Sequence, residues 1–123
     1  MQAIRILADD ICLEAALNDT VAAAELGSRL PCRLHGTDTG IAYRCRTARG
    51  VYDPLEMCSQ VQAGDICLCD GWLTLFYSKQ TEPERLSGYM VVGRLAPEAV
   101  ILLQALPAKA EFRLEKSSEG DKR

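Results

Sequence analysis

The sequence has no long hydrophobic run, and this absence limits where the chain is expected to work. The longest apolar stretch, residues 100–106, is interrupted by Gln104 and is far shorter than the roughly 20 residues that a membrane-spanning helix needs. The first residues also lack the basic start and apolar run of a secretory signal, because the acidic pair Asp9-Asp10 comes too early. We therefore expect a cytoplasmic protein with no membrane partner.

The chain also lacks an excess of basic residues. Its formal net charge is −3, with 14 lysines and arginines against 17 aspartates and glutamates. Binding to phosphate backbones is driven mainly by clustered lysine and arginine. We therefore expect no nucleic-acid partner.

Metal, disulfide and cofactor signatures are absent as well. There is one histidine, no Cys-x-x-Cys pair, and the cysteines have irregular spacing: 12, 32, 45, 58, 67 and 69. Cytoplasmic cysteines of this kind are typically reduced and buried as small apolar groups. The sequence contains no phosphate loop, dinucleotide fingerprint or nucleophile–base pair. We expect no metal and no cofactor, and the sequence assigns no catalytic residue.

The clearest pattern that is present predicts strands at the two ends of the chain. From 108 to 115 apolar residues alternate strictly with charged ones, as in a strand with one buried face. Residues 3–8 and 11–17 predict two more strands, joined by a turn at Asp9-Asp10. Because sheet edges must be covered, we expect 2–8 and 108–115 to pair as antiparallel neighbours.

The middle of the chain predicts short strands and little helix. A helix is expected over 20–30, capped by Asn18, Asp19 or Thr20 and ended by Pro31. Asp70-Gly71 is a strong hairpin turn. The expected strands are 32–36, 41–46, 66–69, 72–77 and 89–95, and residues 97–106 fit either a second short helix or a strand. About eight short strands joined by turns favour a mainly β, closed antiparallel barrel. We expect one domain over 1–116 and a polar tail over 117–123.

Three stretches carry a family resemblance. They are residues 64–77 (GDICLCDGWLTLFY), residues 89–95 (YMVVGRL) and the helix ending at Leu30-Pro31 before a hairpin. Together they resemble the cyclophilin-like proteins, and specifically a minimal prokaryotic family of unknown function. The resemblance implies a cyclophilin-like barrel with one or two short helices and a ligand groove on its outer face.

The resemblance also bears on activity. True cyclophilins isomerise X–Pro bonds with an arginine aimed near the prolyl amide and an apolar pocket that includes a histidine. In the matching run Leu34-His35-Gly36 the arginine falls on Gly36, and the pocket histidine falls on Tyr89. We therefore expect weak or no isomerase activity.

The first predicted hairpin supplies candidate polar residues. Alternation puts Arg33 and His35 on one face of one strand, and Arg44 and Arg46 on one face of the next. If these faces coincide, the cluster would bind a carboxylate or phosphate. The alternative is an ordinary solvated face. No carboxylate partner for His35 is evident in register, so we expect an ordinary exposed histidine.

The second predicted hairpin supplies candidate aromatic residues. One face is apolar core, and the other carries Trp72 and Phe76. Such a surface marks recognition if it is exposed, and the alternative is that a loop or helix covers it. The family pattern favours Tyr77 as the groove aromatic. Alternation favours Phe76, which we prefer because a slip of one residue flips every side chain.

These patterns lead to one hypothesis and two alternatives. The hypothesis is a domain that binds a peptide or small molecule through Arg44, Trp72, Phe76 and Tyr89, with the arginine on a polar or anionic group and the aromatics on an apolar or prolyl one. The first alternative is an active prolyl isomerase that uses Arg44 or Arg46. The second is a homo-oligomer that self-associates through the aromatic face.

Overall fold

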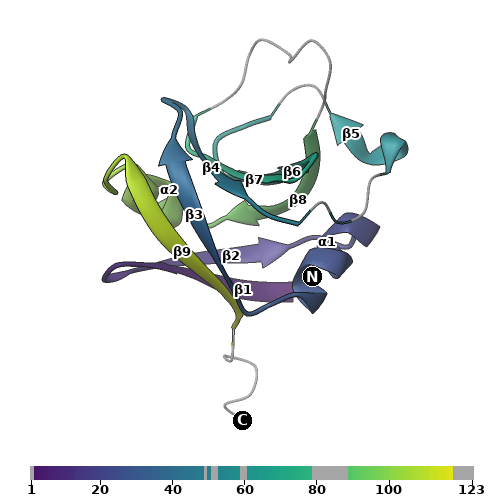
Figure 1. Ribbon diagram of the computed structural model, residues 1–123, viewed down its shortest axis with the longest axis horizontal. Helices are drawn as coiled ribbons and strands as arrows, with labels where there is room; N and C mark the ends of the chain where they lie inside the picture. Colours follow the sequence, from purple (N-terminus) through teal and green to yellow (C-terminus); the bar gives the residue numbers. More distant parts are fainter. Residues whose placement is uncertain (1, 49, 51–52, 59–60, 79–88, 118–123) are drawn as a thin grey trace.

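The computed structural model of the chain describes residues 2–48, 50, 53–58, 61–78 and 89–117. Its strands are β1 (Gln2–Ala8), β2 (Ile11–Leu17), β3 (Cys32–Asp38), β4 (Ala42–Arg46), β5 (Met57–Cys58), β6 (Asp65–Cys69), β7 (Trp72–Phe76), β8 (Tyr89–Leu95) and β9 (Lys109–Lys116). Eight of them form a closed antiparallel barrel in the order β2-β1-β9-β3-β4-β7-β6-β8, because β2 also pairs with β8 (Figure 1). The short β5 pairs with β8 beside the barrel.

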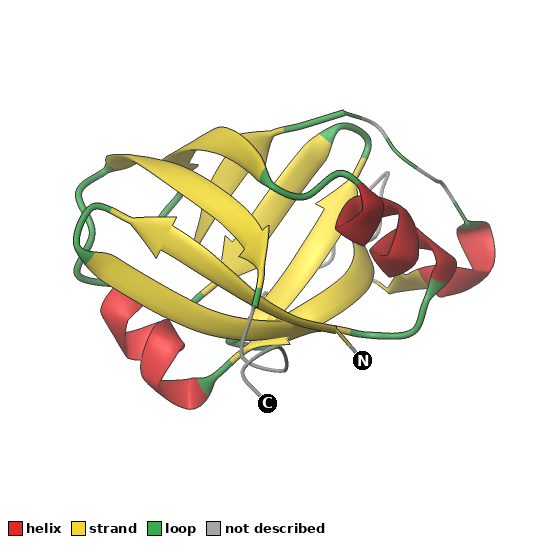
Figure 2. Cartoon of the chain, turned by 90° about the horizontal axis from the view of Figure 1, so that it is seen from below, coloured by secondary structure: helices red, strands yellow, loops and turns green. Residues whose placement is uncertain are grey.

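Three helical segments accompany the barrel: α1 (Val21–Ser28), the 3-10 turn η1 (Pro54–Glu56) and α2 (Pro97–Leu103). Figure 2 shows α1 and α2 on opposite sides of the barrel. The mainly β barrel with two helices is therefore confirmed. No helix within the described ranges is long and apolar enough to cross a membrane.

The two ends of the chain lie side by side, as predicted. Strand β1 pairs with β9 in antiparallel register, with Arg5 opposite Glu115 and Ile6 opposite Leu114. Both strands bury alternate residues, so each contributes one face to the core. The predicted polar tail lies outside the described residues from 118 onward.

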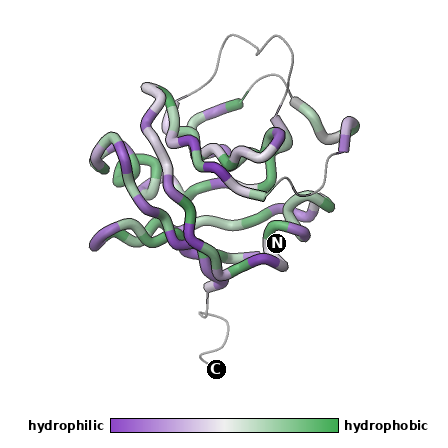
Figure 3. The backbone as a smooth tube through the Cα atoms, in the orientation of Figure 1, coloured by the Kyte–Doolittle hydropathy of each residue, from purple (hydrophilic) through white to green (hydrophobic). Residues whose placement is uncertain are grey.

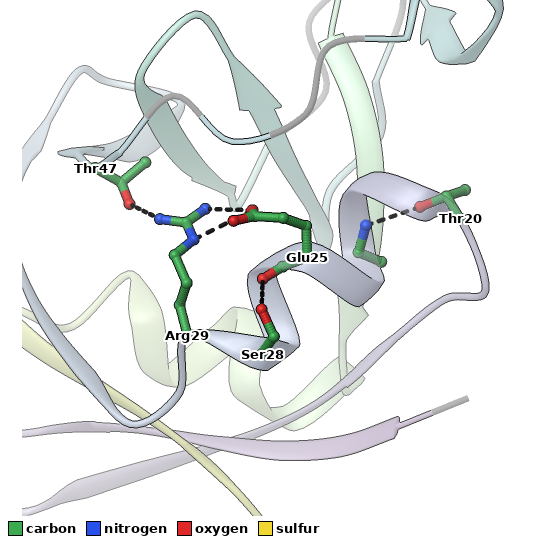
Figure 4. A network of polar contacts seen from close by, with 6 residues as sticks. Thr20, Glu25, Ser28, Arg29 and Thr47 are labelled. Carbon is green, nitrogen blue, oxygen red and sulfur yellow. Dashed lines mark hydrogen bonds and ion pairs between the residues drawn. The ribbon is translucent and has the colours of Figure 1, made fainter.

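Helix α1 is shorter than predicted at both ends. Thr20 is its N-cap, and its side-chain oxygen accepts a hydrogen bond from the amide of Ala23 (3.1 Å) (Figure 4). At the other end the amides of Arg29 and Leu30 bond to carbonyls three residues back, so the chain tightens and leaves the helix before Pro31. Residues 97–103 form a helix rather than a strand. Pro97 occupies its first turn, where no backbone N–H is needed, and Ala99 and Leu103 share its buried face.

The two central hairpins follow the predicted turns. Asp70 and Gly71 both have positive φ (49° and 87°), which the two-residue turn between β6 and β7 requires. Strand β3 runs two residues beyond its predicted end because it continues to pair with β9, where Thr37 lies opposite Lys109.

The core fills the inside of the barrel. Figure 3 shows apolar and polar residues interleaved along the strands. The rings of Tyr43 and Phe112 meet edge to face at 5.6 Å between centroids, and both side chains are buried. The Tyr43 hydroxyl lies 2.7 Å from the carbonyl of Leu106, which satisfies this buried polar group. The interior is therefore closely packed and largely uncharged.

Candidate functional site

The outer face of β3, β4 and β7 brings the predicted polar residues together. Arg44 lies between Thr37 of β3 and Thr74 of β7, and Arg46 lies opposite Trp72 of β7. The side chains of Arg33, His35, Arg44 and Arg46 all point outward and are exposed. The polar faces of the two strands therefore coincide.

Both β4 arginines stack on Trp72. The guanidinium carbon of Arg44 lies 4.1 Å from the centroid of the indole ring, and that of Arg46 lies 4.6 Å from it. These are cation–π contacts, each worth about 0.5–1 kcal/mol at an exposed site. Stacking uses the flat face of a guanidinium and leaves its N–H donors available at the edge. The pair can therefore still recognise a carbonyl, carboxylate or phosphate.

These arginines differ from Arg5, Arg29, Arg94 and Arg113, each of which has an acidic partner. Within the described part of the chain, no carboxylate forms an ion pair with Arg33, Arg44 or Arg46. By contrast, Arg5 and Arg113 share Glu115, at 2.6 Å and 3.3 Å. Among the residues that the structure describes, no carboxylate thus compensates the positive charge on the outer face of β4.

Phe76 and Tyr89 form a second pair farther along the same face. Their rings meet edge to face at 5.4 Å. Phe76 is only 1% exposed, because it packs in a small outer cluster with Ala42, Val61 and Cys67. Of the two alternatives from the sequence, the covered face is therefore correct at Phe76, and the cover includes Val61 from the segment before β6.

The four candidate ligand residues thus lie on one side of the sheet but form two pairs. Trp72 and Phe76 are four residues apart on β7, which corresponds to about 13 Å along a strand. Thr74 lies between them and is buried. The Arg44–Trp72 pair is open to solvent, whereas the Phe76–Tyr89 pair is largely packed.

Tyr77 does not take the outer position that the family pattern suggested. Its ring packs against the main core, and its hydroxyl donates a 2.6 Å hydrogen bond to Oδ1 of Asp38. This hydrogen bond to the carboxylate, together with burial, raises the pKa of Tyr77 to about 12. The alternation of inward and outward residues along β7 predicted the outward aromatic correctly, because it placed Phe76 outward, whereas the family pattern favoured Tyr77.

Gly36, the residue matched to the cyclophilin arginine, faces the interior. A Cβ atom there would lie 2.7 Å from Cε2 of Phe112 and 2.9 Å from Sγ of Cys45. The outward positions on β3 are its neighbours His35 and Thr37. No side chain could therefore leave position 36 toward the outer face in this register.

His35 is exposed, as expected, but a carboxylate does lie in register with it. Glu111 of β9 lies directly opposite His35, and both are exposed. Sequence reasoning missed this neighbour because the pairing of β3 with β9, which is distant in sequence, was not foreseen. The strict alternation over 108–115 already marked Glu111 as outward.

The five cysteines whose side chains are described form no disulfide. Burial raises the pKa of Cys45 to about 12, so this thiol is protonated and unreactive at neutral pH. Within the residues that the structure covers, no three His, Cys, Asp or Glu side chains gather into a possible metal site. The side chain of Cys58 lies outside the described set.

Comparisons with known proteins agree with this fold. The model of the family described as "Cyclophilin-like family" matches residues 6–115. The solution structure of a hypothetical protein from Archaeoglobus fulgidus superimposes with a TM-score of 0.74, over 94% of this chain and 95% of that one, at 17% sequence identity. At that identity the likeness shows the fold alone. The search of curated proteins found no match.

Proposed function

The chain belongs to the cyclophilin-like family, and we propose that it is a binding module that takes a peptide or small ligand on the outer face of the barrel, with weak or no prolyl isomerase activity. The ligand site is centred on Arg44 and Trp72. Arg44 donates to a carbonyl or anionic group of the ligand, and the edge of the Trp72 ring supplies apolar contact.

The observation that carries this proposal is the stacking of two unpaired arginines on one indole ring. An arginine on a wet strand face usually samples many rotamers, and ordering such a side chain on binding costs about 0.5–1.5 kcal/mol. Contact with Trp72 at 4.1 Å restricts Arg44 beforehand. Part of that cost is then met in the free protein, which favours binding.

Tyr89 and Phe76 play a different part in the proposal. Tyr89 is half-buried at the start of β8 and presents the exposed portion of its ring to an apolar or prolyl group. Phe76 is buried against it and holds its ring in place. A ligand that contacts both Trp72 and Tyr89 must reach across β6, which lies between β7 and β8.

Weak isomerase activity follows from the missing donor. The barrier to X–Pro rotation is about 18–20 kcal/mol, and a guanidinium fixed at the prolyl nitrogen lowers it by stabilising the twisted amide. Gly36 faces the core, and Arg44 is held against Trp72 rather than against the Phe76–Tyr89 pair. Self-association through the same face is disfavoured, because a two-fold contact would bring the arginines of both copies together.

The binding of a neutral tetrapeptide with a central Ala-Pro bond tests the proposal. Trp72 is the chain's single tryptophan, so its fluorescence reports directly on the site. We expect a saturable change in emission that Arg44→Ala weakens and that Lys116→Ala, an exposed control outside the site, leaves intact. The absence of any saturable change would refute the binding site.

A protease-coupled assay on the same peptide tests the isomerase alternative. We expect turnover close to the uncatalysed rate. Rapid turnover that collapses in Arg44→Ala but persists in Arg33→Ala would show instead that the catalytic arginine has moved to β4.

A further inference from the structure

The charges of this chain are divided unevenly over its surface. The outward positions of β9, β3 and β4 carry five cations and two carboxylates, namely Arg33, Arg44, Arg46, Lys109 and Arg113 against Glu111 and Glu115. The chain as a whole has a net charge of −3. Glu115 is already paired with Arg5 and Arg113. We call this surface, defined by these seven residues, the basic face.

A shallow depression lies on the basic face between β3 and β9, beside the Arg44–Trp72 pair. It is lined by His35, Gly36, Thr37, Lys109, Ala110 and Glu111. Thr37 is exposed and is the cross-strand neighbour of both Lys109 and Arg44. Because neighbouring strands are about 4.8 Å apart, the backbones of Lys109 and Arg44 are separated by about 10 Å.

An oxyanion above Thr37 would be within reach of Lys109 and a hydroxyl donor, whereas the guanidinium of Arg44 lies on the other side of β4, stacked on Trp72 of β7. The Lys109 side chain is long and flexible enough to lean over Thr37 on the neighbouring strand. Neither Lys109 nor Arg44 forms an ion pair with a carboxylate in the described part of the chain. Anions bound at these two points would relieve the repulsion between the like charges of the basic face.

We propose that the ligand of the basic face is an acidic peptide in extended conformation, with carboxylates at alternate positions, of which one meets Arg44 and Arg46 and a later one meets Lys109 and Thr37. This inference rests on the proposed function and adds the class of ligand. Trp72, on which the two arginines stack, lies on β7, and β4 and β3 separate it from the depression between β3 and β9. At about 4.8 Å per strand the two points are roughly 12 Å apart, which is about four residues of extended peptide.

The structure favours an acidic peptide over a nucleic acid for two reasons. Sequence-independent binding of single strands relies on open aromatic faces for stacking bases, and here two guanidiniums occupy the Trp72 ring. In addition, a chain of net charge −3 repels a polyanion with one charge per nucleotide more strongly than a peptide with one charge per two residues.

Trp72 fluorescence also tests this inference. The probes are an eight-residue peptide with glutamate at alternate positions, the same peptide with glutamine in those places, an eight-nucleotide oligothymidylate, and the neutral Ala-Pro tetrapeptide. We expect the glutamate peptide to bind at least about tenfold more tightly than the glutamine peptide, with the advantage shrinking as salt is added. Lys109→Gln should weaken the binding of the glutamate peptide about fivefold without affecting the binding of the Ala-Pro peptide. Lys116→Gln removes the same charge outside the basic face and should change the affinity for neither peptide.

Three results would overturn the inference. The first is equal binding of the glutamate and glutamine peptides. The second is an equal effect of Lys109→Gln and Lys116→Gln. The third is tighter binding of the oligothymidylate, which would make the face a nucleic-acid surface. If only the Ala-Pro peptide binds, this inference fails while the proposed function stands, and if no probe binds, both fail.

Discussion

The two faces of β3, β4 and β7 are made by the same short stretches of chain and yet differ in almost every physical respect. The inner face packs Leu34, Tyr43 and Cys45 at 8% exposure or less. The outer face carries Arg33, Arg44 and Arg46, all exposed and without a carboxylate partner in the described chain. The inner face accounts for folding, and the exposed part of the outer face is the surface that we propose for recognition.

This contrast has an energetic side. Truncating a large buried side chain typically costs about 3–5 kcal/mol, whereas most exposed substitutions change stability by less than about 0.5 kcal/mol. Substitutions of buried residues should therefore alter the free energy of unfolding, and substitutions of exposed residues on the outer face should alter binding.

The largest expected effect on stability is at Gly36, which faces the interior although the family resemblance matches it to the arginine of the cyclophilin groove. Gly36→Arg restores the residue type of a true cyclophilin, but its side chain would enter the core against Phe112. We expect a loss of at least about 3 kcal/mol in the free energy of unfolding, measured by urea denaturation, and no gain of isomerase activity. Thr37→Arg, one residue away on the outer face, serves as the control and should cost less than about 1 kcal/mol. A stable Gly36→Arg protein with new isomerase activity would mean that β3 has the opposite register.

The next prediction compares the truncation of two aromatic residues on the outer face of β7. Phe76→Ala should lower the free energy of unfolding by about 3 kcal/mol, because Phe76 is buried in the outer cluster with Val61. Trp72→Ala should cost about 1 kcal/mol or less but abolish ligand binding, as followed by calorimetry. Similar stability losses in both variants would contradict the distinction between a packed and an open pair.

A smaller loss of stability should appear at alkaline pH, and it should come from two side chains that pack in the core, Cys45 and Tyr77. The folded-state pKa values of Cys45 and Tyr77 are raised from 9.0 and 10.0 to about 12. The unfolded state therefore loses these protons first, so these two groups lower the free energy of unfolding as the pH rises from 9 to 12 and have little effect on it at neutral pH and below. Cys45→Ala should make this fall shallower in urea denaturation. An equal slope in Cys45→Ala and Arg44→Gln would show that the buried thiol does not carry the effect.

Much of the fold could be predicted from the sequence because its strongest patterns are local. Alternation over 108–115 fixed which residues of β9 face outward, and Asp70-Gly71 fixed the turn between β6 and β7. Both depend on residues only a few positions apart, for which period and turn chemistry are sufficient.

The candidate site was harder to predict because it depends on contacts between distant segments. The burial of Phe76 requires Val61 from a segment with few regular patterns, and the neighbour of His35 comes from β9, 76 residues later. Single-sequence reasoning found Arg44 and Trp72 as outward residues but not their contact, which depends on the register between β4 and β7.

The most direct test of the account is NMR chemical-shift mapping of the labelled chain with the Ala-Pro tetrapeptide. The account predicts that the indole N–H of Trp72 shifts most, together with the amides of Arg44 and Thr74, while α1 and α2 stay unchanged. Shifts confined to α1 or α2, with the Trp72 indole unmoved, would contradict the claim that the outer face of β4 and β7 is the binding site.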